Sequence, residues 1–322
     1  RLYKMSIFKL DPAFKDYIWG GTRLRDEYGK KCDYDKVAES WELSCHKDGP
    51  SVVADGEYKG LTLNEYIEKA GKGVLGKNCE RFENFPILIK LIDAKDNLSV
   101  QVHPDNDYAM RVEGEYGKTE MWYVVDCDEG ATLLYGFKHE ITKEEFARRI
   151  ADNTLLEVTN AVPVKKGDVF FIKSGTLHAI GKGILIAEIQ QNSNTTYRIY
   201  DYGRVGKDGK PRELHVNKAL DVTKLAPAEQ YPETPVEKKD GYDIKLLSKC
   251  EYFTTYRVNV ETKAELDADE NSFNSILVLE GEPVISGGET VSAKKGESVF
   301  ISAGTGKYTV EGKCTFVLTK ID

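Results

Sequence analysis

The chain has 322 residues, of which 40% are hydrophobic and 30% charged, a balance typical of globular proteins with a substantial core. Its formal net charge of -8, without a basic stripe, argues against a nucleic-acid-binding surface. No run of about 18 apolar residues occurs, so the sequence predicts no membrane span, and the first residues lack the long apolar core of a signal peptide.

Short strands dominate the first part of the chain, with a few helices between them. Strand patterns cover residues 7–10, 38–43, 51–53, 85–92, 98–103, 121–125, 157–158, 162–164, 169–172, 184–189 and 195–200. Helices are expected over residues 62–70, 142–151 and 213–225. Thr62 and Thr142 are each followed three residues later by glutamate, which is the capping-box pattern of a helix N-terminus.

The clearest boundary is a proline-rich, charged linker that contains Pro227, Pro232 and Pro235. Beyond it, strands are expected over residues 252–260, 275–279, 298–301 and 315–318. A weak internal repeat relates residues 166–178 to residues 295–307, with Lys307 at the position of His178. The sequence therefore predicts a mainly β protein of two jelly-roll domains. Residues 1–230 would carry the helical insertions, and residues 231–322 would form a smaller domain without metal.

A cluster of polar residues near the middle of the chain suggests a metal site. Ser99, Gln101 and His103 alternate with valines, so they share one face of a strand. Pro104 ends that strand, and residues 105–107 read as a turn. Glu120 then opens the next strand. An imidazole, an amide oxygen and a carboxylate on neighbouring strands would form a partial shell for a divalent metal.

His178 is the fourth candidate ligand. It follows a buried strand and a turn at Ser174-Gly175, an order that resembles the second sequence motif of the cupins. Ser174 stands where that motif usually has proline. The first cupin motif matches loosely, with Gln101 and His103 in the His-x-His positions and Glu120 further along than usual. The resemblance implies cupin-like jelly rolls.

Taken together, several motifs resemble those of the type I mannose-6-phosphate isomerases, in particular the shorter bacterial branch. They are Val-Gln-Val-His-Pro-Asp, Lys-Thr-Glu-Met-Trp, Gly-Thr-Leu-His-Ala-Ile, Tyr-Ile-Trp-Gly-Gly, and Glu188 ten residues before Arg198. The resemblance extends from about Phe8 to the end of the chain. It implies a zinc-dependent aldose–ketose isomerase that interconverts mannose 6-phosphate and fructose 6-phosphate.

The resemblance also implies roles for individual residues. The zinc ligands would be Gln101, His103, Glu120 and His178. The catalytic residues would be Lys118, Glu188 and Arg198, and the substrate would be contacted by Trp19, Ser99 and Asn194. Many family members have aspartate where this chain has Asn194, and an amide cannot ionise. A proton-relay role at that position is therefore in doubt, although the amide can still orient a ligand.

These roles agree with the chemistry of the reaction. Moving hydrogen between C2 and C1 through a cis-enediolate requires a base at carbon and charge stabilisation at the oxygens. Zinc can stabilise that charge as a Lewis acid. Burial of Glu188 would raise its pKa, which suits a base, although a structural pair with Arg198 is the alternative interpretation. Arg198 stays protonated and can hold either the enediolate or the phosphate.

Two other functions stay open. One is a metal-binding cupin that senses a sugar phosphate without turnover, which the loss of a carboxylate at Asn194 favours. The other is a metal-dependent oxygenase, although Lys118 and Arg198 suit an anionic sugar better. We expect a sugar-phosphate substrate, no nucleic-acid or membrane partner, and a monomer or weak homo-oligomer. Six scattered cysteines without a Cys-x-x-Cys pair favour free thiols and a cytoplasmic protein.

Overall fold

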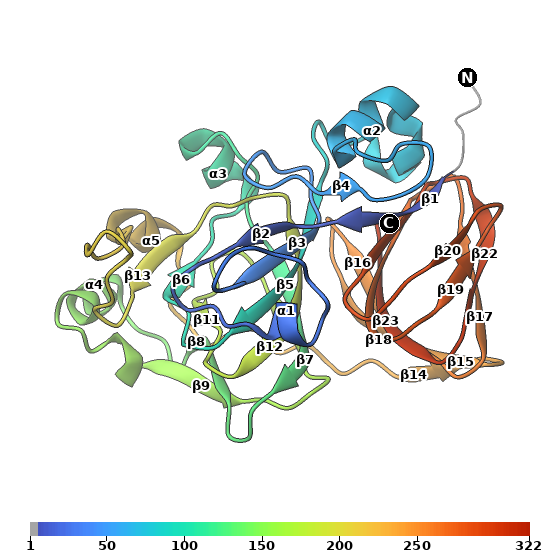
Figure 1. Ribbon diagram of the computed structural model, residues 1–322. Coiled ribbons are helices and arrows are strands. Elements are labelled where there is room, and N and C mark those ends of the chain that lie inside the picture. Colours follow the sequence, from blue (N-terminus) through green and yellow to red (C-terminus); the bar gives the residue numbers. More distant parts are fainter. Residues whose placement is uncertain (1–5) are drawn as a thin grey trace.

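The computed structural model describes residues 6–322, so the first five residues of the expected first domain lie outside it. The chain forms two β-rich lobes, one built from the blue-to-yellow part of the chain and the other largely from the orange and red part (Figure 1). Each lobe contains two sheets, and the strands pair antiparallel throughout both lobes. The mainly β, cupin-like fold expected from the sequence is confirmed.

The first lobe consists of a six-stranded sheet and a five-stranded sheet that face each other. The six-stranded sheet runs in the order β10 (Val169–Ile172), β7 (Glu120–Cys127), β12 (Ile184–Gln191), β5 (Ile87–Ala94), β3 (Glu39–Leu43) and β2 (Ala13–Lys15). The five-stranded sheet runs in the order β13 (Tyr197–Tyr200), β6 (Val100–Val102), β11 (His178–Ala179), β8 (Thr132–Phe137) and β9 (Thr159–Pro163).

The central strands β5 and β12 are buried along their whole length because their sheet is covered on both faces. On the inner face, Ile92 and Ile186 pack with residues of the five-stranded sheet. On the outer face, Leu91 and Ala187 belong to a cluster that includes Phe300 of the second lobe. A strand covered on both sides has no need for alternating polarity, which explains the near-continuous apolar runs in the sequence.

The second lobe contains an eight-stranded and a four-stranded sheet. The larger runs in the order β14 (Val236–Lys238), β15 (Tyr242–Lys249), β16 (Thr254–Val260), β23 (Cys314–Lys320), β18 (Asn274–Gly281), β21 (Ser298–Ile301), β1 (Ile7–Asp11) and β4 (Val52–Val53). The smaller runs in the order β17 (Lys263–Ala268), β22 (Gly306–Glu311), β19 (Val284–Ser286) and β20 (Thr290–Ser292). The N-terminal strand β1 thus pairs with β21, with Ile7 opposite Ile301.

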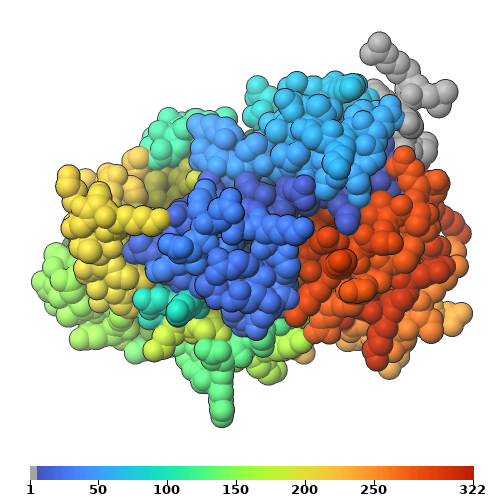
Figure 2. All heavy atoms as spheres, in the orientation of Figure 1, coloured from blue at the N-terminus to red at the C-terminus, as the bar shows by residue number. Residues whose placement is uncertain are grey.

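The helices are short and lie at the edges of the sheets (Figure 1). They are α1 (Arg23–Asp26), α2 (Leu63–Ala70), η1 (Lys72–Leu75), η2 (Lys77–Cys79), α3 (Asn106–Val112), α4 (Lys143–Ala151), η3 (Leu155–Glu157) and α5 (Val216–Val222). The predicted capping box of α2 is present: Thr62 Oγ1 accepts from the Glu65 amide at 3.2 Å, and the Thr62 amide donates to Glu65 Oε2 at 2.8 Å. The space-filling view shows the α2 region covering the junction between the two lobes (Figure 2).

One predicted turn is wrong. Residues 105–107 begin the helix α3, and Asp105 is its N-cap, with Oδ1 accepting from the Tyr108 amide at 2.9 Å. Aspartate favours turns and helix N-caps for the same reason, because its short side chain accepts hydrogen bonds from nearby backbone amides. The helix expected over residues 213–225 is also shorter, since α5 begins at Val216, and residues 157–158 end a 3-10 helix instead of forming a strand.

Two expectations from composition can be compared with the structure. Within residues 6–322, no helix combines the length and apolar character needed to cross a bilayer. All six cysteines are free thiols, as expected.

Candidate metal centre and active site

The structure brings three of the four predicted metal ligands together. Candidate ligand atoms of His103, Glu120 and His178 all lie within 4.8 Å of one another. The two imidazole Nε2 atoms are 3.1 Å apart, and the Glu120 carboxylate oxygens lie 3.5 Å from that of His103 and 3.3 Å from that of His178. Among residues 6–322, these three residues are the group of histidine, cysteine and carboxylate side chains whose ligand atoms lie close enough together to bind one metal ion.

Strand ends position the three side chains. His103 follows β6, Glu120 begins β7, and His178 begins β11. His178 Nδ1 lies 2.8 Å from the Thr176 carbonyl, so an N–H donated there leaves Nε2 facing the group. This fixes the ring in the orientation that a metal-binding histidine requires.

The protonation states fit a divalent cation. Burial, together with nearby Lys118, lowers the pKa of His103 to about 3, and burial also lowers the pKa of His178, so both imidazoles are neutral. Burial opposes ionisation of Glu120, but the adjacent His103 and Lys118 lower its pKa overall. Glu120 Oε2 is buried without a hydrogen-bond partner. Two neutral imidazoles and a carboxylate with one oxygen that accepts no hydrogen bond form a donor set suited to a metal.

Gln101 lies between a candidate ligand and a candidate catalytic residue. In the five-stranded sheet it is directly opposite His178 on β11 and opposite Arg198 on β13. Directly paired residues of antiparallel strands point to the same face, so the three side chains share the face that looks toward the six-stranded sheet. Gln101 Nε2 donates to the Ser99 carbonyl at 3.3 Å. Ser99 itself is buried beside this strand.

Lys118 reaches the same centre from the loop before β7. Its backbone N–H donates to the Pro104 carbonyl at 3.0 Å, and its ammonium nitrogen lies 3.9 Å from Glu120 Oε2. The preceding Gly117 allows this close approach, because a Cβ added there would lie 2.4 Å from the Asp105 backbone carbon. The lysine is 5% exposed, so its charge faces the interior.

Glu188 is held on the inner face of β12. The Trp122 indole Nε1 lies 2.9 Å from Glu188 Oε2 and 3.1 Å from Glu120 Oε1, so one donor serves both carboxylates. Burial and the nearby charge of Glu120 raise the pKa of Glu188 to about 8, against the opposing effect of Lys90. A carboxyl group that titrates near neutral pH is suited to proton transfer.

Arg198 presents a guanidinium without a carboxylate partner. Its Nη1 donates to the Glu213 carbonyl at 2.9 Å, and its Nε is buried without a hydrogen-bond partner. Among the described residues, no carboxylate forms an ion pair with it, and Glu188 in particular does not. Burial and nearby Arg212 lower its pKa, yet arginine remains protonated in proteins. A positive charge with free donors at this place is suited to an anionic ligand.

The structure also locates the remaining predicted substrate contacts. Trp19 is 4% exposed within the core between the two sheets, with its ring centroid 5.7 Å from that of Tyr17. Asn194 Nδ2 donates to Asp48 Oδ2 at 3.0 Å, so its amide already holds a carboxylate. Several charged side chains interact electrostatically with the Tyr17 hydroxyl, namely Glu39, Asp48, Arg212 and Arg198.

Sequence reasoning missed three buried residues beside Glu188. These are Glu39, Lys90 and Trp122, each no more than 6% exposed. The available signal was Lys90, a charged residue that interrupts the apolar run from Ile87 to Ile92. A lysine in a strand covered on both faces requires a partner, because a buried charge is costly unless it is paired.

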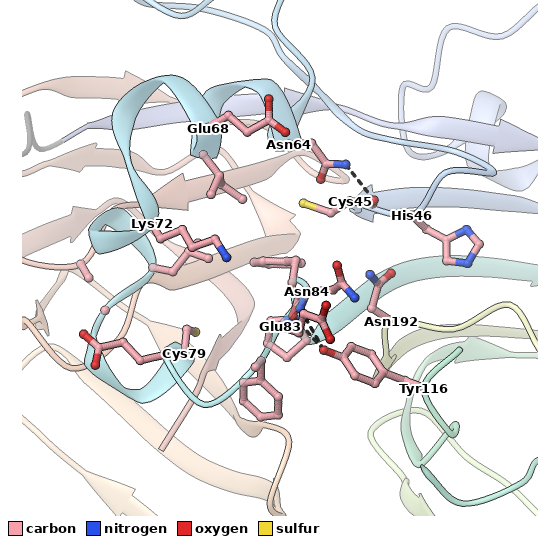
Figure 3. A pocket seen from close by; sticks show the side chains of 18 of the residues that line it. Cys45, His46, Asn64, Glu68, Lys72, Cys79, Glu83, Asn84, Tyr116 and Asn192 are labelled. Carbon is pink, nitrogen blue, oxygen red and sulfur yellow. Dashed lines mark hydrogen bonds between the residues drawn. The ribbon is translucent and has the colours of Figure 1, made fainter. Parts of the chain in front are cut away.

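A separate cavity of about 1080 Å3 lies between the α2–η2 region and the loop before β7. Figure 3 shows Glu68 and Lys72 on one side of it and Tyr116 and Asn192 on the other. None of the three grouped metal-ligand candidates lines it. Glu115 lines the cavity together with His46, which it contacts, and it accepts a hydrogen bond from the Asn194 backbone N–H at 3.2 Å.

Comparison with known proteins identifies the family. A family model described as phosphomannose isomerase type I, catalytic domain, matches residues 7–130, and one described as mannose-6-phosphate isomerase, cupin domain, matches residues 243–321. A putative mannose-6-phosphate isomerase of Bacillus subtilis is 40% identical over 314 residues, which cover 97% of this chain and 98% of that protein.

Two further relatives agree with this assignment. The mannose-6-phosphate isomerase of Streptococcus mutans is 40% identical over 291 residues, 88% of each chain. A crystal structure of the mannose 6-phosphate isomerase from Bacillus subtilis matches with a TM-score of 0.92 at 39% identity, covering 98% of this chain and 99% of that one. The likeness thus extends over both lobes and the candidate site, and the chain belongs to the type I mannose-6-phosphate isomerase family.

Proposed function

We propose that the protein interconverts mannose 6-phosphate and fructose 6-phosphate through a cis-enediolate, with zinc as its metal. The observation that carries the proposal is the arrangement of His103, Glu120 and His178 beside Glu188, a buried carboxyl group with a raised pKa. Gln101 would be the fourth ligand, since it lies opposite His178 in the sheet. When bound, the metal supplies Lewis-acid stabilisation of negative charge on the substrate oxygens.

The side chains of the site then divide the remaining work. Glu188 takes the proton from C2 of the open-chain aldose, which breaks the C–H bond and leaves the enediolate. It returns that proton to C1, while the hydroxyl proton of O2 passes to O1, so that the carbonyl group forms at C2 and the hydroxyl group at C1. Arg198 holds negative charge of the enediolate or the phosphate, because its guanidinium has no carboxylate partner. Lys118 stabilises negative charge beside Glu120 with its ammonium group. Trp19, Ser99 and Asn194 would shape the substrate site.

Several broader expectations are part of the same proposal. We propose a division into residues 1–230 and 231–322, a cytoplasmic location and a monomer or weak homo-oligomer. The segment of β22 that corresponds to the His178 region contains Lys307, whose ammonium pairs with Glu265 at 3.0 Å. We therefore propose that the second domain has a structural role and binds no metal.

A coupled assay tests the proposal against a sugar-phosphate sensor. The protein should convert each hexose phosphate into the other, lose this activity after dialysis against a chelator, and regain it with zinc. Elemental analysis should find one metal ion per chain. A protein that binds mannose 6-phosphate but shows no turnover with metal present would favour the sensor, which Asn194 makes a specific alternative.

A further inference from the structure

A row of buried polar side chains crosses the inner face of the six-stranded sheet. Lys90 on β5 is directly opposite Trp41 on β3 and opposite Glu188 on β12, and Glu188 is in turn opposite Trp122 on β7. Directly opposed residues share a face, so four neighbouring strands each contribute one side chain to the row. All four residues are at most 4% exposed.

Lys90 is held between two carboxylates within this row. Its ammonium nitrogen lies 3.4 Å from Glu39 Oε2 and 4.0 Å from Glu188 Oε1. It also lies 4.7 Å from the ring centroid of Trp41, whose Nε1 donates to Glu39 Oε2 at 2.7 Å. Burial disfavours the ammonium, but Glu39 and Glu188 raise its pKa, so it remains charged.

Stability alone does not explain such an arrangement. Buried ion pairs often stabilise a fold no better than apolar residues of similar size, because the charges must be removed from water. An apolar side chain at this position would continue the run from Ile87 to Ile92, whose other residues are all apolar. Lys90 is therefore better explained by what it does to Glu188.

The charges around Glu188 come from every side of the site. Glu39 on β3, Lys90 on β5, Glu120 on β7 and Lys118 on the loop before β7 all interact with it. The facing sheet contributes the neutral imidazoles of His103 and His178 near Glu120. Lys90 is the cation on the side away from the candidate metal group, and Glu39 competes with Glu188 for the same ammonium.

We propose that Lys90 is a positioning residue for Glu188: its ammonium, 4.0 Å from Glu188 Oε1, holds that carboxyl group in place and favours the ionised form that accepts the substrate proton, and Glu39 limits this effect by sharing the ammonium at 3.4 Å. Lys90 retains its own proton throughout, so the proton moves only between substrate carbon and Glu188. The inference rests on the proposed role of Glu188 as base, and it assigns functions to two residues that no motif indicated.

The pH dependence of kcat/KM for mannose 6-phosphate, measured with the metal-loaded full chain, tests the proposal. In Lys90→Met the acid limb of the pH profile, where kcat/KM falls as Glu188 binds a proton, should move to higher pH by about one unit. The reason is that a nearby ammonium lowers the pKa of a carboxyl group by about one to three units, and the substitution removes that ammonium. Activity below the limb should therefore fall about tenfold. Glu39→Gln should move the limb to lower pH, and Lys90→Arg should keep it near the wild-type position. Titration of the substrate phosphate is common to all variants, so it does not affect the comparison.

Two further variants keep the test decisive. Lys90→Met combined with Glu39→Gln removes one positive and one negative charge, so it should fold even if the single lysine variant does not, and its limb should lie between those of wild type and Lys90→Met. Glu188→Gln tests the base itself. Near-normal turnover in Glu188→Gln would overturn the proposed function. If Glu188→Gln does lose turnover, two results would overturn only the role given to Lys90. One is an acid limb that does not move in Lys90→Met, and the other is a shift of the same sign in Lys90→Met and Glu39→Gln.

Discussion

Replacing Trp122 by phenylalanine should weaken the fold and the metal site together. The substitution removes one indole N–H that serves two buried carboxylates, Glu188 at 2.9 Å and Glu120 at 3.1 Å. Hydrogen bonds to charged groups contribute about 1.5–3 kcal/mol each, and the smaller ring leaves a cavity that costs about 1 kcal/mol more. Because one N–H is shared between the two carboxylates, it counts once, and we expect the free energy of unfolding to fall by about 2.5–4 kcal/mol.

The same substitution should lower metal affinity. Trp122 orients the Glu120 carboxylate, and groups that orient a metal ligand are typically worth 10- to 100-fold in affinity or activity. Unfolding in urea should be followed by circular dichroism, because the substitution removes a fluorophore, and metal affinity by competition with a chromophoric chelator.

Trp41→Phe is the matched control for this experiment. It is equally buried in the same row and loses one hydrogen bond, to Glu39 at 2.7 Å, but it does not contact a candidate metal ligand. It should cost stability with little effect on metal affinity. If Trp122→Phe stays within about 1 kcal/mol of wild type and binds metal equally well, the indole does not hold the two carboxylates as the geometry suggests.

Three further predictions concern the candidate site. Chelation should lower the melting temperature, because a metal that binds only the folded state at 100 times its Kd contributes about 2.7 kcal/mol to stability. Differential scanning calorimetry should show no such shift in His178→Ala, whereas the control His139→Ala, at an exposed histidine, should retain it. Arg198→Ala should reduce kcat far more than it raises KM if the guanidinium holds charge that develops only in the enediolate, and steady-state kinetics showing the loss mainly in KM would restrict it to phosphate binding. Asn194→Asp would place a second carboxylate where the amide now donates to Asp48 at 3.0 Å, so one of the pair should bind a proton and the pH profile should shift; an unchanged profile would mean that Asn194 only orients its neighbours.

The sequence allowed prediction of the group of His103, Glu120 and His178 because each candidate ligand is marked locally. His103 and Glu120 lie at the ends of strands, and His178 follows a turn within a recognisable motif. The polar row was not predicted, because its members come from four separate strands and meet only through the register of the sheet. Local periodicity indicates which face a residue occupies, but it does not indicate which residue of another strand lies opposite.

Likewise, the sequence predicted β1 as a strand but not its partner. Its pattern shows an apolar face, while the pairing of Ile7 with Ile301 depends on contacts between opposite ends of the chain. The error at residues 105–107 has a different origin, because Asp105 is compatible with both a turn and a helix N-cap. Only the following residues of α3 and their packing decide between the two.

The position of β1 has a consequence for how the protein is made. A ribosome releases β1 first and β21 near the end of synthesis, so the first strand waits without its partner while the rest of the chain emerges. An unpaired strand edge is prone to pair with other chains, and contacts between distant residues form slowly. Shortened chains that end before β21 should therefore associate or be degraded, and the isolated second lobe would lack both β1 and β4 of its larger sheet. Moving residues 7–11 to the C-terminus by circular permutation would place this strand close in sequence to its partner.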